Sequence, residues 1–166
     1  MTSADFEIAV ATHDDIADIL TLQEENLPEN GGMLSVRLPH QWFEAALAQM
    51  PVVLARKDGQ VVGYLVASTL SSQAHVPIIQ SMMRAYSPVP DAYLYGPICV
   101  AASERGRGLP AQLFATQRRL LANRPCFTFI RRDNPVSLRA HEKIGMHEVA
   151  EFAHDGSAIV VVASAG

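Results

Sequence analysis

The stretch Glu104-Arg105-Gly106-Arg107-Gly108-Leu109-Pro110 decides the fold of this chain. An apolar run, Tyr93 to Val100, precedes it, and an apolar pattern with helical spacing, Leu109 to Leu121, follows it. The glycines let main-chain N–H groups turn towards a ligand. The helix that starts there adds unpaired N–H groups and the positive end of its dipole. The stretch therefore predicts a strand, a loop and a helix that together bind phosphate.

A second stretch with a clear pattern follows about 25 residues later: Asn134-Pro135-Val136-Ser137-Leu138-Arg139-Ala140-His141-Glu142-Lys143-Ile144-Gly145-Met146. Asn134 is a good N-cap, and Pro135 suits the first position of a helix. Gly145 is placed to end that helix in the left-handed conformation. The stretch therefore predicts a capped helix that follows the strand Cys126–Arg131.

Length and composition indicate one domain, residues 1–166, with a sizeable core. The chain has 166 residues, of which 49% are hydrophobic and 18% are charged, so a disordered chain is excluded. No apolar run approaches the roughly 18–20 residues of a membrane span, and the N-terminus lacks the pattern of a signal peptide. Cys99 and Cys126 lie in apolar runs that are typical of buried reduced thiols. We therefore expect a cytoplasmic protein with no membrane partner.

Charge is distributed unevenly along the chain. Residues 1–30 hold eight acids and no Lys or Arg, whereas residues 105–143 hold nine of the thirteen bases and only two acids. The basic block favours an anionic ligand, although single arginines are also compatible with solvated helix faces. Nucleic acid is not expected as a partner, because the net charge is −4 and no aromatic residues alternate with the arginines.

Helix signals occur at several further points. Thr12, with Asp15 three residues later, predicts the capped start of a helix that extends to Pro28. Pro39 opens a second, short helix. Apolar residues between Val76 and Tyr86 recur at helical spacing, with loops on both sides. The helix after the phosphate loop is expected from about Gly108 to Ala122.

Strand signals surround these helices, and Asp58-Gly59 and Asp155-Gly156 are typical hairpin turns. Strands are expected at Phe6–Val10, Pro51–Arg56, Val61–Thr69, Ala92–Val100, Cys126–Arg131, Met146–Ala153 and Ser157–Ala163. Strands that alternate with helices, next to hairpins, indicate a mixed sheet covered by helices on both faces. The fold class is therefore α/β (α+β).

The two informative stretches make the chain resemble the GNAT superfamily, the N-acetyltransferases that use acetyl-CoA. The family's pyrophosphate loop reads Gln/Arg-x-x-Gly-x-Gly/Ala, and residues 105–110 follow it up to the last position. The family's later helix often reads Asn-x-x-Ser-x-x-x-Tyr-Glu-Lys-x-Gly-Phe, and the chain shares Asn134, Ser137, Glu142, Lys143 and Gly145 with it. The resemblance implies a mixed, mostly antiparallel sheet with a splayed central strand pair and helices on both faces.

The resemblance also implies how acetyl-CoA is bound. Strand residues Ile98, Cys99 and Val100 would offer main-chain groups to the pantetheine arm, next to a break at Gly96-Pro97. The loop residues would wrap the pyrophosphate, and its two arginines would add charge, for example to the 3′-phosphate: Arg105, Gly106, Arg107, Gly108, Leu109 and Pro110. Asn134 and Ser137 are candidate contacts from the later helix, and Ser137 is equally compatible with packing.

Two departures from the family pattern matter for the chemistry. Pro110 replaces Gly/Ala and has no N–H, so one main-chain donor is lost, although proline is easily accommodated in a first turn. His141 replaces the tyrosine that is thought to protonate the departing CoA thiolate. A histidine can also act as this general acid near neutral pH, and the alternative is a helix residue packed near the cofactor.

The remaining candidate residues concern the acceptor amine. Tyr93 and Tyr95 lie on the strand before the loop and are candidate catalytic groups, while no residue is identified as the general base. Glu24, Glu25 and Tyr86 are candidate substrate contacts, and the acid-rich first helix favours a cationic amine. No metal site is expected, because the histidines lack ligand spacing and the chemistry needs no metal.

The sequence therefore predicts an acetyl-CoA-dependent N-acetyltransferase for a small-molecule or peptide amine. The alternative is a non-catalytic acyl-CoA-binding sensor or regulatory module. The departures from the family pattern at Pro110 and His141 are compatible with this alternative. A nucleotide-binding regulator is less consistent with a loop that lacks the Lys-Ser/Thr of a Walker motif. The segment from Leu70 to Pro90 is compatible with a lid, or with a surface helix that packs on the sheet or on the second subunit of a homodimer.

Overall fold

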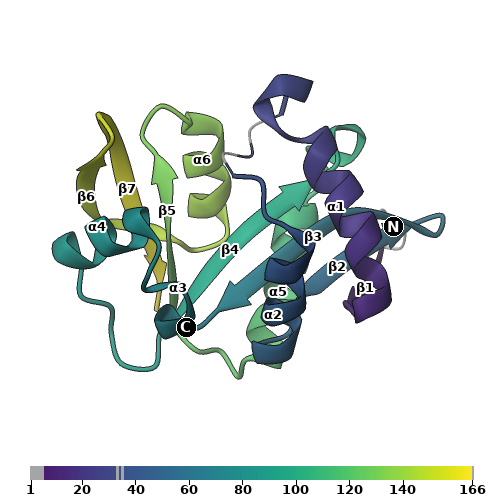
Figure 1. Ribbon diagram of the computed structural model, residues 1–166, viewed down its shortest axis with the longest axis horizontal. Helices are drawn as coiled ribbons and strands as arrows, with labels where there is room; N and C mark the ends of the chain where they lie inside the picture. The colour runs from purple at the N-terminus through teal and green to yellow at the C-terminus, as the bar shows by residue number, and fades with distance from the viewer. Residues whose placement is uncertain (1–5, 33, 35, 166) are drawn as a thin grey trace. The chain divides into compact units, whose positions relative to one another are not determined.

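The computed structural model describes residues 6–32, 34 and 36–165 (Figure 1). The chain divides into two compact units, of which the first comprises Met1–Ala67 and Gly96–Leu120 and the second comprises Ser68–Tyr95 and Leu121–Gly166. Strand β4 (Tyr93–Val100) passes from the second unit into the first. Each unit has its own cluster of buried hydrophobic residues.

Strands β1 (Glu7–Val10), β2 (Val53–Lys57) and β3 (Gln60–Ser68) are antiparallel neighbours in the first unit. Asp58 and Gly59 join β2 to β3 with φ angles of 52° and 80°, which is the type I′ geometry that a tight hairpin needs. The hairpin predicted at this dipeptide is therefore confirmed. The second half of β4 lies beside β3.

The helices of the first unit begin where the capping signals predict. The Thr12 main-chain N donates to Asp15 Oδ2 at 2.8 Å, and the Asp15 N donates to the Thr12 carbonyl at 2.9 Å, so the capping box is formed. Pro39 directly precedes the second long helix. The helical elements are the 3-10 helix η2 (His13–Asp15), α1 (Ile16–Glu25), η3 (Pro28–Asn30), α2 (His40–Gln49), η4 (Ala102–Glu104) and α5 (Leu109–Leu120).

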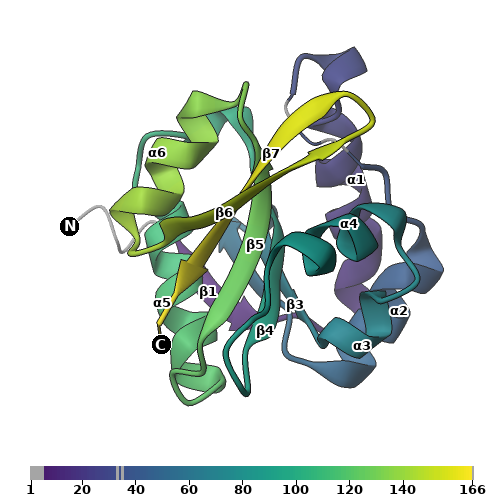
Figure 2. The same cartoon turned by 90° about the vertical axis from the view of Figure 1, so that its left-hand side faces the viewer.

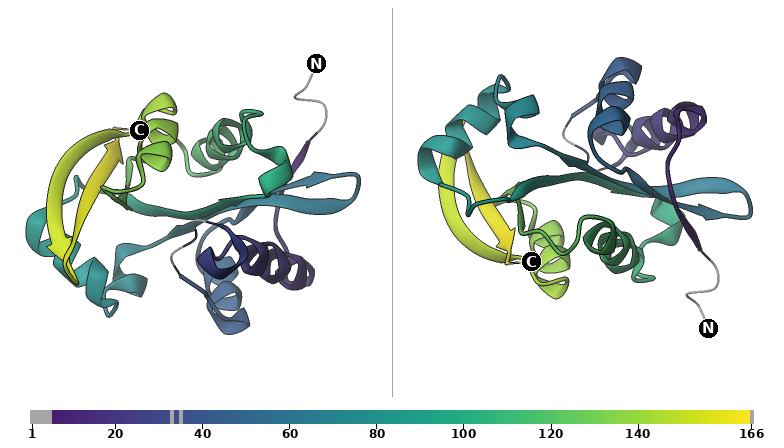
Figure 3. Two further views of the ribbon diagram at one scale, coloured as in Figure 1. Left: turned by 90° about the horizontal axis from the view of Figure 1, so that it is seen from above. Right: turned by 90° about the horizontal axis from the view of Figure 1, so that it is seen from below.

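Helices α1 and α2 lie on one face of the first unit's strands, and α5 lies on the other (Figure 3). The core on the α1 and α2 side is built mainly from Ile16, Ile19, Phe43 and Tyr64, all without solvent exposure. Helix α5 approaches β3 closely at Gly63, because a Cβ there would lie 3.0 Å from Leu109 Cδ2. This packing fixes the start of α5 against the sheet.

The second unit contains β5 (Cys126–Arg131), β6 (His147–His154) and β7 (Ser157–Ser164), with antiparallel pairs β5–β7 and β7–β6. Its helices are α3 (Leu70–Gln73), α4 (Pro77–Ala85) and α6 (Pro135–Lys143). Strand β4 runs parallel to β5, and among the described residues the paired positions are Tyr93 with Cys126 and Leu94 with Phe127. The pairing therefore stops before β4 enters the first unit.

Helices α6 and α4 lie on opposite sides of β5, β7 and β6 (Figure 2). The buried cluster on the α4 side contains Ile79, Met82, Leu94, Phe127 and Val161. The segment predicted as one helix between two loops contains α4 and, before it, the single turn α3. The extra turn forms because the Thr69 side chain caps α3 and because a proline at position 77 starts a separate helix.

The strand order is β1-β2-β3-β4-β5-β7-β6, so the predicted mixed, mostly antiparallel sheet is confirmed. Helix α5 ends two residues before its predicted limit, since Ala122 and Asn123 have φ angles of 53° and 58° that no α-helix accepts. The later helix ends at a left-handed glycine as predicted, because Gly145 has a φ of 94°.

Candidate functional site

The predicted phosphate loop, residues 105–110, forms a turn between η4 and α5 and continues into the first residues of α5. It lies in the first unit. Gly106 and Gly108 have φ angles of 78° and 76°, a conformation that glycine adopts without strain. In the part of the chain that the structure describes, their main-chain N–H groups donate to no other group. A Cβ at either position would meet nothing within 4 Å, so the space beside both residues is open. Two donors at the start of a twelve-residue helix are therefore available to an anion.

The charged side chains of this loop are held by other residues of the first unit. Glu104 is buried, and its carboxylate accepts hydrogen bonds from Lys57 Nζ at 3.2 Å and from Ser103 Oγ at 3.0 Å. Burial alone would raise the pKa of Glu104, but these two hydrogen bonds lower it below its ordinary value. Arg107 NH1 lies 3.9 Å from the same carboxylate. Arg105 instead points at Asn26 of the α1 end, and its NH2 donates to Asn26 Oδ1 at 2.7 Å.

The strand residues predicted to contact the pantetheine arm lie at the end of β4. Ile98 and Val100 are half-buried, whereas the Cys99 side chain is buried in the core beneath α1. The Cys99 thiol donates weakly to the Leu22 carbonyl at 3.9 Å, and burial raises the pKa of the thiol to about 12. Cys99 can therefore offer only its main chain to a ligand. Pro110 occupies the second position of α5, where its missing N–H disturbs no helical hydrogen bond.

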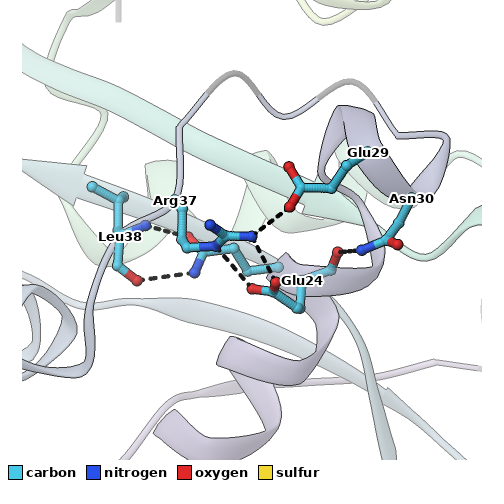
Figure 4. A network of polar contacts seen from close by, with 6 residues as sticks. Glu24, Glu29, Asn30, Arg37 and Leu38 are labelled. Atoms are coloured by element: carbon cyan, nitrogen blue, oxygen red, sulfur yellow. Dashed lines mark hydrogen bonds and ion pairs between the residues drawn. The ribbon is translucent and has the colours of Figure 1, made fainter.

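An open hollow of about 670 Å³ lies along the C-terminal half of α1 and is lined by Leu20, Thr21, Glu24, Glu25 and Asn30. It contains both glutamates predicted to contact the acceptor. Glu24 accepts two hydrogen bonds from Arg37, which also donates to Glu29 at 2.7 Å (Figure 4). Glu25 has no ion pair with any described residue, so its charge is the less compensated of the two.

Helix α6 in the second unit positions the predicted contacts from the later motif. Asn134 Oδ1 accepts a hydrogen bond from the Ser137 N at 3.2 Å, so the predicted cap is formed. Its Nδ2 group has no partner among the described residues, and the cap therefore leaves a donor available for a ligand. The Ser137 carbonyl and hydroxyl both contact the ring of His141.

His141 is buried on α6, and its ring lies edge-on to Tyr95 with 5.3 Å between the ring centroids. Burial lowers the pKa of His141, and the hydrogen bond with the Ser137 carbonyl opposes part of this effect. Nδ1 lies 2.7 Å from that carbonyl, which can only accept, so Nδ1 carries the proton of the neutral ring. Nε2 then has no proton, and the ring must first take one up before it can act as a general acid.

The protein is expected to lose stability below neutral pH partly because of His141. Its folded-state pKa is lower than the ordinary value of 6.5, so the unfolded chain binds the proton first. This contribution to stability is complete above about pH 6.5 and is lost as the pH falls below that value. The replacement His141→Phe keeps a ring beside Tyr95 and removes the titration. Urea unfolding from about pH 8 to pH 5 should show a smaller loss in the variant, and equal losses would contradict the prediction.

The three candidate tyrosines are all packed against other side chains of the second unit. Tyr93 and Tyr95 are buried on β4, and the Arg124 guanidinium lies 5.6 Å from the centroid of the Tyr93 ring. The Tyr86 ring lies 5.6 Å from that of Phe127. Burial raises the pKa of Tyr86 and of Tyr95, so both phenols are neutral at pH 7.

Neither a metal centre nor a membrane span was found in the part of the chain that the structure describes. Within residues 6–32, 34 and 36–165, no group of three or more His, Cys, Asp or Glu side chains is arranged to hold a metal ion. Over the same residues, each helix is too short or too polar to cross a lipid bilayer.

Comparison with known proteins identifies the class to which this loop and sheet belong. The family model described as Acetyltransferase (GNAT) family matches residues 16–146, which is most of the chain. The chain therefore belongs to the GNAT acetyltransferase family and is an enzyme of the acyltransferase class, as the resemblance predicted. No curated protein sequence matched the chain.

Solved structures share the fold at low sequence identity. Ribosomal-protein-alanine N-acetyltransferase from Brucella melitensis is 19% identical, with a TM-score of 0.71 over 96% of this chain and 99% of its own. Ard1 from Thermoplasma volcanium is 17% identical, with a TM-score of 0.71 over 96% of each chain. The protein yncA from Salmonella typhimurium, solved with its cofactor acetyl-CoA, is 17% identical, with a TM-score of 0.68 over 96% of this chain and 92% of its own. At these identities the likeness concerns the fold.

Sequence reasoning missed the polar contacts that hold the segment after α1. Gln23 is buried, and its amide group both donates to and accepts from the main chain of Leu38, each at 2.9 Å. A glutamine on the apolar side of a predicted helix was the available signal. No sequence pattern could have predicted that Arg105 binds Asn26, because the two residues are 79 positions apart.

Proposed function

We propose that this protein transfers the acetyl group of acetyl-CoA to a primary amine of a small molecule or a peptide. The observation that carries the proposal is the pair of available N–H donors at Gly106 and Gly108, at the start of α5. Main-chain donors at a helix N-terminus suit a diphosphate, because they supply hydrogen bonds and a positive dipole end without a mobile side chain. Membership of the GNAT family supports the same coenzyme.

The proposed reaction is a direct attack on the thioester. The amine loses a proton, its nitrogen forms a bond to the acetyl carbon, and the carbon–sulfur bond breaks to release CoA thiolate, which takes up a proton. The Val100 main-chain N–H is the proposed donor to the carbonyl oxygen, whose negative charge grows as the amine attacks. Alignment of amine and thioester supplies much of the rate.

We propose separate coenzyme contacts in each unit. In the first unit, main-chain groups of Ile98, Cys99 and Val100 bind the pantetheine arm, and main-chain groups of residues 105–109 bind the diphosphate beside Pro110. In the second unit, Asn134 and Ser137 are proposed contacts, and the unpartnered Asn134 Nδ2 supports the first of these. His141 is the proposed proton donor to the thiolate, after its Nε2 has taken up a proton.

The proposed acceptor is a cationic amine that enters the hollow along α1. Glu25 supports this choice, because its carboxylate lines the hollow and has no ion pair with a described residue. Glu24 contributes less net charge than the sequence suggested, since Arg37 neutralises part of it. Tyr93 and Tyr95 remain candidate catalytic groups, and Tyr86 remains a candidate contact of the acceptor. The buried, unbridged cysteines support a cytoplasmic location.

Calorimetry with acetyl-CoA, followed by an assay of CoA thiol release across a panel of amines, tests the proposal. We expect binding in the micromolar range and thiol release that depends on an amine, with cationic amines preferred. Binding without amine-dependent release would instead favour the acyl-CoA sensor. Absence of acetyl-CoA binding would overturn both the acetyltransferase and the sensor hypotheses. A preference for free nucleotides over CoA would favour the nucleotide-binding regulator.

A further inference from the structure

Arg105 is an exposed residue, but its side chain makes a hydrogen bond within the protein. Its NH2 group donates to Asn26 Oδ1 at 2.7 Å, and this hydrogen bond links the phosphate loop to the end of α1. Asn26 is 4% exposed and Arg105 is exposed, so the acceptor of this hydrogen bond is buried while its donor comes from the surface. Both residues belong to the first unit.

Asn26 uses every polar group that it has. Its Nδ2 donates to the Leu22 carbonyl at 2.9 Å, and its main-chain N donates to the Gln23 carbonyl at 3.0 Å. Its own carbonyl accepts from the Leu34 N at 3.0 Å. Asn26 therefore links the last turn of α1, the segment that follows α1, and the phosphate loop.

The segment after α1 is held by three further contacts with the same helix. Gln23 pairs with the main chain of Leu38, Arg37 bridges Glu24 and Glu29, and Asn30 Nδ2 donates to the Glu24 carbonyl at 2.8 Å (Figure 4). These contacts make the described part of residues 26–38 one polar network with the end of α1. The Asn26 side chain connects that network to Arg105.

From this geometry we propose that Arg105 and Asn26 form a positioning pair for the reaction. The Arg105 guanidinium holds the phosphate loop against the end of α1 and is not a ligand of a coenzyme phosphate. The loop therefore keeps its Gly106 and Gly108 donors in place only while Asn26 accepts from Arg105. Because the same asparagine anchors the segment beside the hollow, coenzyme binding stabilises that segment, and the effect is reciprocal.

The inference rests on the proposed function for its coenzyme, and calorimetry with acetyl-CoA and its 3′-dephospho analogue tests it. Arg105→Met and Asn26→Ala should each weaken binding of both compounds about tenfold, and the double variant should be no weaker than either. Asn26→Asp keeps the acceptor oxygen and should bind within about twofold of the wild type. Arg119→Gln, which removes an exposed charge elsewhere on α5, should bind normally.

Hydrogen exchange separates this inference from the proposed function. Without any coenzyme, Arg105→Met should speed exchange in residues 26–34, and Asn26→Ala should speed exchange in residues 104–108. Acetyl-CoA should protect residues 26–34 in the wild type but not in Arg105→Met. If wild-type protein binds no acetyl-CoA, the proposed function fails while the coenzyme-free exchange still tests the pair. If Arg105→Met weakens binding and Asn26→Ala does not, Arg105 is a phosphate ligand and the inference is overturned.

Discussion

Valine at both Gly106 and Gly108 is expected to weaken acetyl-CoA binding by about 100-fold while the free protein stays folded. Both glycines have φ angles near 77°, where a β-branched residue is strained by about 1–2 kcal/mol. Nothing lies within 4 Å of either Cβ position, so the valines meet no steric clash. The free loop can relax to other φ angles, and that relaxation turns the two N–H donors away. Calorimetry on the double variant measures the loss.

Gly59→Val is the matched control for this prediction. Gly59 also belongs to the first unit, has a φ of 80° and has an open Cβ position, but it lies in the β2–β3 hairpin turn. The same strain there should lower stability by about 1–2 kcal/mol and leave coenzyme affinity unchanged. Acetyl-CoA affinity that survives in the loop variant, or an equal loss in the control, would show that the glycine donors do not bind the diphosphate.

Gly32→Ala is expected to destabilise the protein by about 3 kcal/mol, because the new methyl group has no space. Its Cβ would lie 1.9 Å from the Asn26 carbonyl oxygen and 2.2 Å from the carbonyl carbon. These are main-chain atoms of the residue that anchors the network after α1, so no side-chain rotation relieves the clash. The free energy of unfolding in urea measures the effect.

Gly31→Ala serves as the neighbouring control for that measurement. Gly31 has a φ of 85°, but nothing lies within 4 Å of its Cβ position. Only conformational strain is added, and a loss of about 1 kcal/mol is expected. If the two variants lose the same stability, the segment after α1 is not packed on Asn26 as described, and the basis for the Arg105–Asn26 pair weakens with it.

Local signals explain why most elements could be predicted from the sequence. Asp58-Gly59 forms its hairpin and Asn134 caps its helix because the residues that interact are at most three positions apart. Gly145 ends α6 for the same reason, since only a residue tolerant of positive φ fits there. The turn α3 was not predicted, because its N-cap, Thr69, lies at the end of a segment whose sequence pattern indicates a strand.

The candidate site was predictable only in part. The phosphate loop and the donors of Gly106 and Gly108 follow from glycine spacing and a helix start, both of which are properties of a short stretch. The protonation state of His141 could not be predicted from the sequence. Burial lowers the pKa of its ring, and that burial depends on which residues the fold places around it. The partner of Glu24 was equally hidden, since Arg37 lies 13 residues away across an irregular segment.

The sequence by itself determined the order of strands and helices, the turns that join them and the glycine-rich loop before α5. Each of these depends on backbone preferences and on hydrogen bonds between near neighbours in the chain. Only the tertiary structure decided that Arg105 binds Asn26 and that the Cys99 thiol faces the Leu22 carbonyl of α1. Such contacts form between residues far apart in sequence, and no local preference encodes which distant groups the folded chain brings within hydrogen-bond distance.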